Sequence, residues 1–349
     1  VIDSLDELRL LTPELLRHRR QVLALKQFFA ARRTTVLFLD ESAKGPGEPQ
    51  LQSLVHGVIA LDVLPASPGS PRRRLRVVKM RGRSVQGGDH DFRIVTGGLE
   101  VFPRLVSPVR RRSADSGATL GGVQGLDQLL GGGLRRGGST LLVGPAGTGK
   151  STVAAQYAVA AARRGERAVL FCFDEAVDVL AARCRSLGLP LEDLETQEKL
   201  ALRSIDPAGT SPGEFADAVR REVEGRGASL VVIDTLEGWA SGLGESSGAK
   251  VHLRELMGWL GGSGVTAVFV SAGDGPSIDA GRLAEAVVSF GRFEGGGEVR
   301  LGAGVSKNRS GPHERRPREV RFDQGGLWVG EPLAGTSSTA GGDHARGDA

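Results

Sequence analysis

The sequence predicts an α/β protein built on a doubly wound, mainly parallel sheet with an antiparallel extension near its C-terminal end, present as one partial and one complete copy. Three observations predict this class. Short apolar runs alternate with helical patterns, a glycine-rich loop joins one such run to a helix, and the first part of the chain aligns with a later part. Strands that alternate with helices form parallel sheets with helices on both faces.

The composition indicates a globular chain of about two domains, given its 349 residues and 40% apolar content. No run approaches the roughly 18 to 20 apolar residues that cross a bilayer, and the first residues are neither basic nor signal-like. We therefore expect a cytoplasmic protein with no membrane contact. The two cysteines, Cys172 in an apolar run and Cys184 in a helical pattern, predict buried thiols rather than a disulfide.

The formal charge of +4 comes with clusters of arginine, which raises the question of nucleic-acid binding. The clusters at 72–74, 110–112 and 315–316 lie in segments rich in Pro, Gly and Ser, with few aromatic residues among them. We interpret them as solvated loops. The sequence therefore does not favour a nucleic-acid partner.

Residues 144–151, GPAGTGKS, match the pattern G-x-x-x-x-G-K-[ST] between an apolar run and a helical run. This context is typical of a loop that wraps a polyphosphate with its backbone N–H groups. Lys150 is expected to reach the β- and γ-phosphates, and the Ser151 hydroxyl is placed to ligate Mg²⁺. A nucleoside triphosphate is therefore the first ligand to expect, against the alternative of a plain glycine-rich turn.

Five apolar runs of β type and the helical patterns between them make up the complete copy. The predicted strands are 139–144, 168–173, 200–205, 230–234 and 266–271, and the predicted helices include 152–164, 212–225 and 250–261. After residue 286 the pattern changes to strands at 287–294, 298–305 and 319–329 with glycine turns, which indicates an antiparallel extension.

The first part of the chain resembles a later part at a nearly constant offset. Asp3 aligns with Asp234 at an offset of 231 residues, and Lys79 aligns with Lys307 at an offset of 228. Between these points, residues 36–41 align with 268–273. The first copy thus begins inside the motif that contains Asp234 in the second, and it has no phosphate loop.

The repeat divides the chain into a partial first domain at 1–107, a linker at 108–118, a complete domain at 119–330 and a disordered tail at 331–349. The linker carries an arginine triplet with Ser and Gly, and the tail has almost no large apolar residues. A start at Val1, inside a motif, indicates a fragment of a longer protein rather than a degenerate domain. We expect the first copy to expose an unpaired strand edge or an apolar face.

Asp234 ends the apolar run at 230–234, which places it at the carboxyl edge of the predicted sheet beside the phosphate loop. There it can hold Mg²⁺ through water or through the Ser151 hydroxyl. An apolar strand that ends in Asp is common, but its position after a phosphate loop favours the metal role. Asp3 has no phosphate loop in its own copy and is interpreted as structural or vestigial.

Asp174 and Glu175 end the strand that follows the phosphate loop, at an edge that faces the γ-phosphate. One of these carboxylates can orient or deprotonate an attacking water, and the longer Glu175 side chain reaches further. The alternative is a cap for the predicted helix at 176–184, since acidic residues are favoured at helix N-termini.

Lys307, Arg309 and His313 lie in a turn rich in Gly, Ser and Pro, beyond a strand and far in sequence from the phosphate loop. Such donors suit contact with the polyphosphate of a neighbouring subunit, as an arginine finger does, which predicts an oligomer. The alternative is a solvated basic hairpin. In the first copy Lys79 and Arg81 recur, but no histidine follows at the same spacing.

Residues 122–134, GVQGLDQLLGGGL, together with the phosphate loop after them, resemble the lead-in of RecA-like ATPases of the KaiC type. The acidic pair at 174–175, the strand end at 233–235 and the cationic turn at 307–313 fall where that family has its catalytic carboxylates, its metal-site aspartate and its subunit-bridging residues. The resemblance spans nearly the whole chain, and the tandem arrangement fits KaiC better than its single-domain relatives.

The resemblance implies an ATP-hydrolysing homohexamer that works as a signalling switch, with ATP and Mg²⁺ at the subunit interfaces and a protein signalling partner. By that analogy Lys150, Asp174 and Glu175 are catalytic, and Ser151 and Asp234 hold the metal. The residues implied to bind nucleotide are Gly144, Gly147, Thr148, Gly149, Lys150, Ser151, Thr152, Asp234, Lys307, Asn308, Arg309 and His313.

One departure from the family concerns self-phosphorylation, which in KaiC takes place on an adjacent Ser-Thr pair. The aligned positions in the segment 277–285 are Ala284 and Glu285, and neither can accept phosphate. The alignment therefore excludes self-phosphorylation at these positions and argues against a timekeeping role.

Three other functions stay open on the residues alone. They are a binding module that assembles on nucleotide without turnover, a DNA-directed motor of the RadA or replicative-helicase kind, and a protein kinase that acts on other substrates. The motor would need an aromatic platform for bases, which the sequence does not show. The kinase would need a peptide-binding signature, and none is visible.

Overall fold

The computed structural model describes residues 1–11, 14–41, 49–64, 71–107, 119–242, 248–273, 280–295, 298–333 and 337–338. The chain divides into two compact units, unit one at Val1–Pro65 and Pro71–Val101 and unit two at Ala66–Ser70 and Phe102–Ala349. The linker predicted at 108–118 and the arginines at 110–112 lie outside the described residues, so the domain limits stay a prediction.

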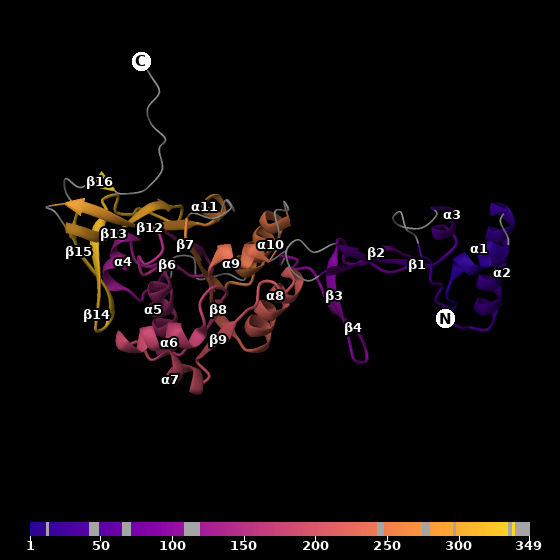
Figure 1. The fold of residues 1–349 in the computed structure, drawn as a ribbon, viewed down its shortest axis with the longest axis horizontal. Helices are drawn as coiled ribbons and strands as arrows, with labels where there is room; N and C mark the ends of the chain where they lie inside the picture. Colours follow the sequence, from indigo (N-terminus) through magenta and orange to yellow (C-terminus); the bar gives the residue numbers. More distant parts are fainter. Residues whose placement is uncertain are drawn as a thin grey trace, which may run out of the picture. The chain divides into compact units, whose positions relative to one another are not determined.

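Unit two is built on a large sheet with a parallel centre (Figure 1). The parallel strands are β7 (Ser139–Val143), β8 (Arg167–Cys172), β9 (Leu200–Ser204), β10 (Ala228–Asp234) and β11 (Thr266–Ser271). They lie side by side in the order β7-β11-β10-β8-β9. The five predicted strands are therefore confirmed, and the strand that ends in Asp234 lies next to the strand that precedes the acidic pair.

An antiparallel extension continues the sheet beyond β7. Its strands are β12 (Ala286–Gly295), which is parallel to β7, and then β13 (Glu298–Asn308), β14 (Arg318–Asp323) and β15 (Gly326–Pro332). The single strand predicted at 319–329 is wrong, because the chain turns back there and forms the β14–β15 hairpin. Gly325 and Gly326 make this turn with φ values of 126° and 103°, a region that favours glycine.

The disordered tail predicted at 331–349 is wrong for its described residues. Glu331 and Pro332 end β15, and β16 (Ser337–Ser338) pairs with β12. The rest of the predicted tail, apart from Leu333, lies outside the described residues.

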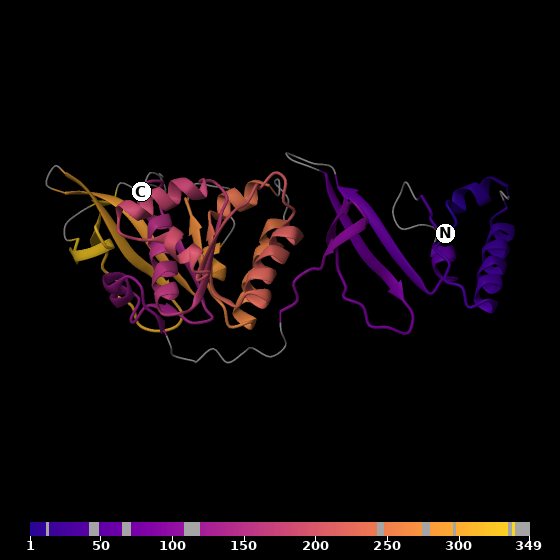
Figure 2. The ribbon, with the colours of Figure 1, turned by 90° about the horizontal axis from the view of Figure 1, so that it is seen from below.

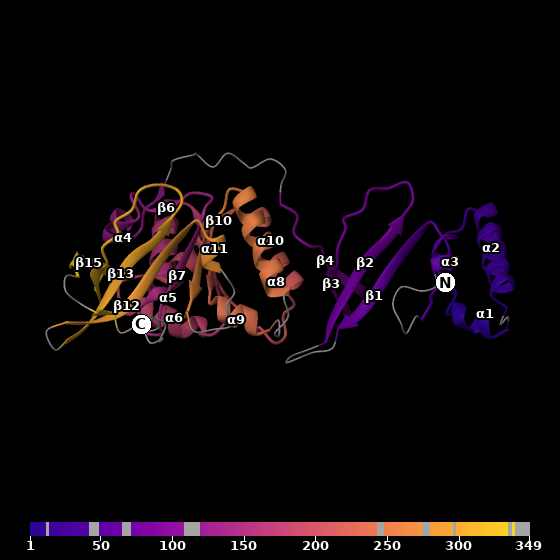
Figure 3. The same ribbon diagram turned by 90° about the horizontal axis from the view of Figure 1, so that it is seen from above.

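Helices cover both faces of this sheet, as Figures 2 and 3 show from opposite sides. One face carries α4 (Gln124–Leu129), α5 (Lys150–Arg163), α6 (Val177–Ser186) and α7 (Leu191–Thr196). The other carries α8 (Pro212–Arg220), the π-helical turn η1 (Arg221–Gly225), α9 (Leu236–Ser241), α10 (Gly248–Gly262) and α11 (Ala280–Leu283). A small hairpin of β5 (Thr119–Leu120) and β6 (Leu134–Arg135) flanks α4. A hydrophobic core lies on each face of the sheet. Successive strand residues point to opposite faces, so Val232 of β10 lies in one core and Val231 in the other.

The doubly wound architecture predicted from the sequence is therefore confirmed. In the described part of the chain, no helix has both the length and the apolar character needed to cross a membrane.

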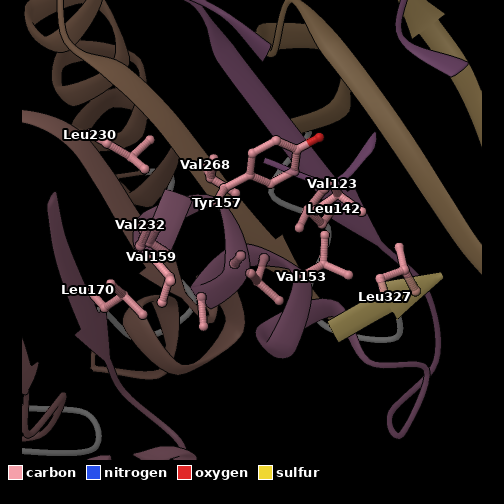
Figure 4. Packing of buried hydrophobic residues seen from close by; sticks show 14 of the residues in the cluster. Val123, Leu142, Val153, Tyr157, Val159, Leu170, Leu230, Val232, Val268 and Leu327 are labelled. Carbon is pink, nitrogen blue, oxygen red and sulfur yellow. The ribbon is translucent and has the colours of Figure 1, made fainter. Parts of the chain in front are cut away.

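The helix that follows the phosphate loop, α5, forms the centre of one core (Figure 4). Its small buried side chains let the sheet approach closely; they are Ala154, Ala155, Ala158, Ala161 and Ala162. Tyr157 is fully buried near Val123 and Leu142, and its hydroxyl donates to Asp127 Oδ1 at 2.7 Å. Burial raises the pKa of both the Tyr157 hydroxyl and the Asp127 carboxyl. This contact fixes the lead-in helix α4 against α5.

Unit one has an antiparallel sheet in the order β1-β2-β3-β4. Its elements are α1 (Leu5–Leu11), α2 (Leu15–Ala31), α3 (Pro49–Gln52), β1 (Gly57–Leu64), β2 (Arg72–Met80), β3 (His90–Val95) and β4 (Gly98–Phe102). The expectation of a solvated loop at 72–74 is wrong, because these arginines begin β2. There Arg72 pairs with Asp91 at 3.4 Å, so a cross-strand carboxylate neutralises part of the cluster.

Strand pairing repeats between the two units. Ile2 pairs with Phe38 in a parallel bridge, just as Ile233 pairs with Phe269. Both residues of the first pair precede their counterparts by 231 positions. The internal repeat is thus visible in the register of the strands. The predicted alignment of residues 36–41 with 268–273 is off by one position, because Phe38 corresponds to Phe269.

The sheet of unit one exposes an apolar face. Its β1–β2 pair corresponds to β12–β13, because each pair has a register shift at the same place, after Val58 and after Val287. On this face of β1, Ile59 and Leu61 are each 55% exposed, whereas Val288 of β12 is fully buried in the core around α5. Among the described strands, β1 pairs with β2 alone. The exposed face and edge predicted for the first copy are confirmed.

Candidate nucleotide site

The phosphate loop leaves the carboxyl end of β7 and runs directly into α5, which begins at Lys150. Gly149, the residue before the helix, has a φ of 86°, and a Cβ at this position would overlap the ring of Phe322. Both the backbone conformation and the close approach therefore require glycine. The amino end of a helix of this length offers N–H groups and a positive dipole end to an anion.

The side chain of Lys150 lies inside the loop and is 6% exposed. Its Nζ donates to the carbonyl oxygen of Gly144 at 2.6 Å and to that of Pro145 at 2.8 Å. Thr148 Oγ1 donates to the same Pro145 oxygen at 2.8 Å, and Thr152 is buried in the first turn of α5. A polyphosphate at this helix end would meet a positive charge that is already in place.

Asp234, at the end of β10, is 6% exposed and lies against Ser151. Its carboxylate accepts a hydrogen bond from the Ser151 hydroxyl, and within the described residues its buried Oδ1 has no hydrogen-bond partner. Burial raises the pKa of Asp234 to about 6; the Ser151 hydrogen bond opposes this shift, and the nearby charge of Glu175 adds to it. A buried oxygen without a partner calls for a ligand.

The donors at this point fit Mg²⁺. The ion takes oxygen ligands, uses one or two side chains, and obtains the rest from phosphate and water. Ser151 Oγ and Asp234 Oδ1 supply two such oxygens. No group of three or more His, Cys, Asp or Glu side chains that could hold a metal occurs within the described ranges. A metal at Ser151 and Asp234 would therefore depend on the nucleotide for its remaining ligands.

Asp174 and Glu175 lie beside Asp234, because β8 and β10 are neighbouring parallel strands. The backbone N–H of Phe173 donates to Asp234 O at 2.8 Å, which ties the two strand ends together. The Asp174 side chain is exposed and accepts a hydrogen bond from the Thr235 hydroxyl. The structure thus brings both predicted acids to the edge that holds the phosphate loop.

The half-buried Glu175 is held by an arginine that the sequence analysis did not single out. Arg183 on α6 donates from Nη1 to Glu175 Oε1 at 2.5 Å and from Nη2 to Oε2 at 2.8 Å. The helix α6 begins after Ala176, which makes no side-chain cap. The alternative that Asp174 or Glu175 caps this helix is therefore wrong.

Two residues of the antiparallel extension also contact the phosphate loop. Arg292 on β12 donates from Nη2 to Ala146 O at 3.3 Å, and Phe322 on β14 lies against Gly149. No sequence motif marks either residue, because their place depends on how β12 and β14 follow β7 in the sheet. Arg183 left a weak signal, since it stands eight residues after Glu175 on a predicted helix.

The side chains of the cationic turn at 307–313 make hydrogen bonds within their own chain. Lys307 Nζ donates to three carbonyl oxygens at the end of α11, at 2.6 to 3.2 Å, and Arg309 donates to the same segment at 3.1 Å. Asn308 Nδ2 donates to Leu130 O at 3.0 Å. His313 is half-buried in the connection between β13 and β14. The alternative of a solvated basic hairpin is therefore wrong for Lys307, which is half-buried and donates to carbonyl oxygens of its own chain.

This turn lies near the amino end of β7, whereas the phosphate loop follows its carboxyl end. Asn308 pairs with Ala286, and Ala286 lies opposite Thr140, near the amino end of β7. The phosphate loop leaves the carboxyl end of that strand. The turn is thus placed away from the phosphate loop of its own unit, and its reach to a neighbour's nucleotide stays a prediction.

The two cysteines are buried thiols without a disulfide, as predicted. Burial raises the pKa of Cys172 to about 12 and that of Cys184 to about 11. Both thiols are therefore protonated at neutral pH and take no part in nucleophilic chemistry.

The sheet order, the glycine-rich loop before α5 and the carboxylates at the neighbouring strand ends define a RecA-like protein of the phosphate-loop class. A profile of the KaiC ATPase family matches residues 1–106 and 120–333. The chain therefore belongs to the KaiC family.

Several proteins named circadian clock oscillator protein KaiC are similar to this chain. One from a Picosynechococcus strain is 25% identical over 266 residues, which cover 74% of this chain and 51% of the relative. One from Acaryochloris marina is 26% identical over 262 residues, with 73% and 50% covered. One from a Nostoc strain is 26% identical over 277 residues, with 77% and 52% covered. The chain spans about half the length of the curated relatives it matches.

Proposed function

We propose that unit two binds ATP with Mg²⁺ at the phosphate loop and hydrolyses it, with Glu175 as the general base. Membership of the KaiC ATPase family supports the class of reaction. The observation that carries the proposal is the buried Asp234 carboxylate, which has an oxygen without a partner beside the Ser151 hydroxyl. A plain structural carboxylate at this strand end would have its hydrogen bonds satisfied.

Each residue has a separate part in the proposed reaction. Lys150 offsets the negative charge of the β- and γ-phosphates, and Ser151 and Asp234 hold the Mg²⁺. When bound, the ion stabilises charge on the leaving phosphate. Glu175 orients the attacking water and accepts its proton. Asp174 accepts a hydrogen bond from the Thr235 hydroxyl and so helps to hold the ends of β8 and β10 together.

We infer a homohexamer in which nucleotide lies between adjacent subunits, and in which Arg309 and His313 face the nucleotide of a neighbour, with Lys307 and Asn308 fixing the turn. The distance of this turn from its own phosphate loop supports a role between subunits. A protein signalling partner and a cytoplasmic location belong to the same proposal. The clock function in the names of the relatives concerns proteins about twice as long as the matched region.

Self-phosphorylation is not part of this proposal. Ala284 is fully buried and has no hydroxyl, and the backbone N–H of Glu285 donates to Ser139 O at 2.9 Å. These two positions align with the phosphate-accepting pair of the family. We therefore propose that the chain transfers the γ-phosphoryl group of ATP to water and not to a side chain at these positions.

Two variants test the proposal. Lys150→Ala should weaken ATP binding by at least about tenfold and abolish phosphate release, because it removes the cation of the loop. Glu175→Gln should bind ATP as the native chain does but hydrolyse it about 100-fold more slowly, the effect of losing a general base. Steady-state phosphate release and nucleotide titration measure both. Unchanged release in both variants would contradict the assignment of this loop as the hydrolytic site.

A second candidate function is nucleotide-driven assembly with little turnover. The pairing of both Glu175 oxygens with Arg183 favours it, because a carboxylate whose two oxygens both accept hydrogen bonds is less available to take a proton from water. Under this function, ATP would change the oligomeric state in sizing experiments while no phosphate is released.

A further inference from the structure

The contact between Arg183 and Glu175 is unusual for a carboxylate that must accept a proton. Both guanidinium Nη atoms donate, one to each carboxylate oxygen, at 2.5 and 2.8 Å. The pair is partly shielded from water, with 28% exposure for the Glu175 side chain and 40% for Arg183. A two-pronged Arg–carboxylate contact fixes orientation and is among the stronger ionic contacts in proteins.

Arg183 also lies near the buried Asp234 carboxylate, so its cation stands close to the proposed metal site as well as to Glu175. Arg183 also has a buried Nε with no hydrogen-bond partner among the described residues. The guanidinium is thus positioned by its contact with Glu175 rather than by a network of other partners.

We propose that Arg183 is a positioning residue that restrains Glu175 and slows hydrolysis, an inference that rests on the function proposed above. In that reaction the water oxygen bonds to the γ-phosphorus, the bond to the β–γ bridging oxygen breaks, and a water proton passes to Glu175. Arg183 opposes the last of these steps. It donates to both carboxylate oxygens, so it occupies lone pairs that would accept the proton, and it holds the carboxylate in one orientation.

The test uses Arg183→Gln with a matched control on the same helix. Arg185 also makes a bidentate pair, with Glu192, but that pair is exposed and does not include Glu175. Arg183→Gln should raise kcat about 3- to 10-fold, a fraction of what a general base contributes. It should leave KM for ATP within about twofold, since no phosphate contact is removed. Arg185→Gln should match the native chain, and Arg183→Lys should fall between native and Arg183→Gln.

The double variant Arg183→Gln with Glu175→Gln tests whether the effect passes through Glu175. It should be as slow as Glu175→Gln alone. Thermal melting of the nucleotide-free variants gives a second readout, because a real pair makes the two single effects non-additive. A kcat that stays level or falls in a folded Arg183→Gln protein overturns the inference, as does a rise that persists without Glu175.

Failure of this inference differs from failure of the proposed function. If the native chain hydrolyses ATP in a Lys150-dependent way and Arg183→Gln does not exceed it, only the restraint is wrong. If neither the native chain nor Arg183→Gln releases phosphate, the proposed function and this inference are both wrong. If the native chain releases none, Arg183→Gln releases phosphate and the added Lys150→Ala abolishes that release, the function and the inference are both supported.

Discussion

At the scale of single residues, Glu166 forms an ion-pair cluster that should contribute to the stability of unit two. Its carboxylate accepts two hydrogen bonds from Arg136, at 2.7 and 2.9 Å, and one from Arg164 at 2.9 Å. These contacts join the segment before β7 to the end of α5. The Arg136 hydrogen bonds are the main cause that lowers the pKa of Glu166 below its ordinary value of 4.5.

This shift predicts a pH-dependent loss of stability in Glu166→Gln. Since the folded-state pKa is lowered, the stabilisation is present above pH 4.5 and is lost as the pH falls through the folded pKa. At pH 7 the variant should lose about 1 kcal/mol of unfolding free energy, because the arginines are partly solvated. Thermal melting at pH 7 and at lower pH measures this.

The matched control is Glu298→Gln, whose partner is Arg300 and whose side chain is 73% exposed. It should melt like the native chain at both pH values. A Glu166→Gln deficit of the same size at low pH would show that the carboxylate acts through packing and not through its charge.

At the scale of elements, a lysine anchors a short helix in each unit. Lys307 donates to the carbonyl oxygens at the end of α11, and Lys79 donates to Gln52 O at the end of α3, at 2.7 Å. A helix of four residues leaves its carbonyl groups without intrahelical partners. The ammonium groups satisfy some of these, so the recurrence of Lys79 and Lys307 has a structural reason in both copies.

Lys307→Met should therefore destabilise unit two without nucleotide present. Loss of its partly buried hydrogen bonds should cost about 1 to 2 kcal/mol and lower the melting temperature by about 3 to 6 °C. Arg309→Met, which removes one hydrogen bond from an exposed side chain, should have less than half this effect. Equal melting of native and Lys307→Met proteins would show that the lysine serves another purpose, such as a neighbour's nucleotide.

The sequence predicted elements well where periodicity and glycine punctuation agree. All five parallel strands and α5 follow from apolar runs beside helical patterns. The β14–β15 hairpin was missed although the turn residues at 323–326, DQGG, interrupt the apolar residues there, because they were read as part of one strand. Arg72 was missed because arginine is common in loops, and its strand position depends on Asp91 across the sheet.

The candidate site was predictable where it follows from order along the chain. Lys150 and Asp234 are local motifs, and their meeting follows from strand order. Phe322 could not be found, because its contact with Gly149 arises from the tertiary packing of β14. Arg183 left only a weak signal, its place on the predicted helix eight residues after Glu175. Lys307 was interpreted by its charge alone, and charge does not reveal the carbonyl groups that bind it.

At the scale of the whole molecule, the two copies differ in how far their apolar strand residues are covered. In unit two, Val288 and Phe290 of β12 pack into the core around α5. Their counterparts in unit one, Ile59 and Leu61, are exposed on β1, together with Val63 at 64%. An exposed apolar patch on a strand whose outer edge has no partner among the described strands favours association between molecules.

Replacing Ile59, Leu61 and Val63 together by Thr should reduce this association, because Thr keeps the strand propensity and removes apolar surface. We expect weaker binding of a dye specific for apolar surfaces and a lower apparent mass in light scattering at high protein concentration. Val179→Thr with Val251→Thr is the matched control, since these residues are also exposed, at 56% and 52%, but stand singly on helices. If dye binding and mass are the same in the triple variant as in the native chain, the face of β1 is covered in solution and does not drive association.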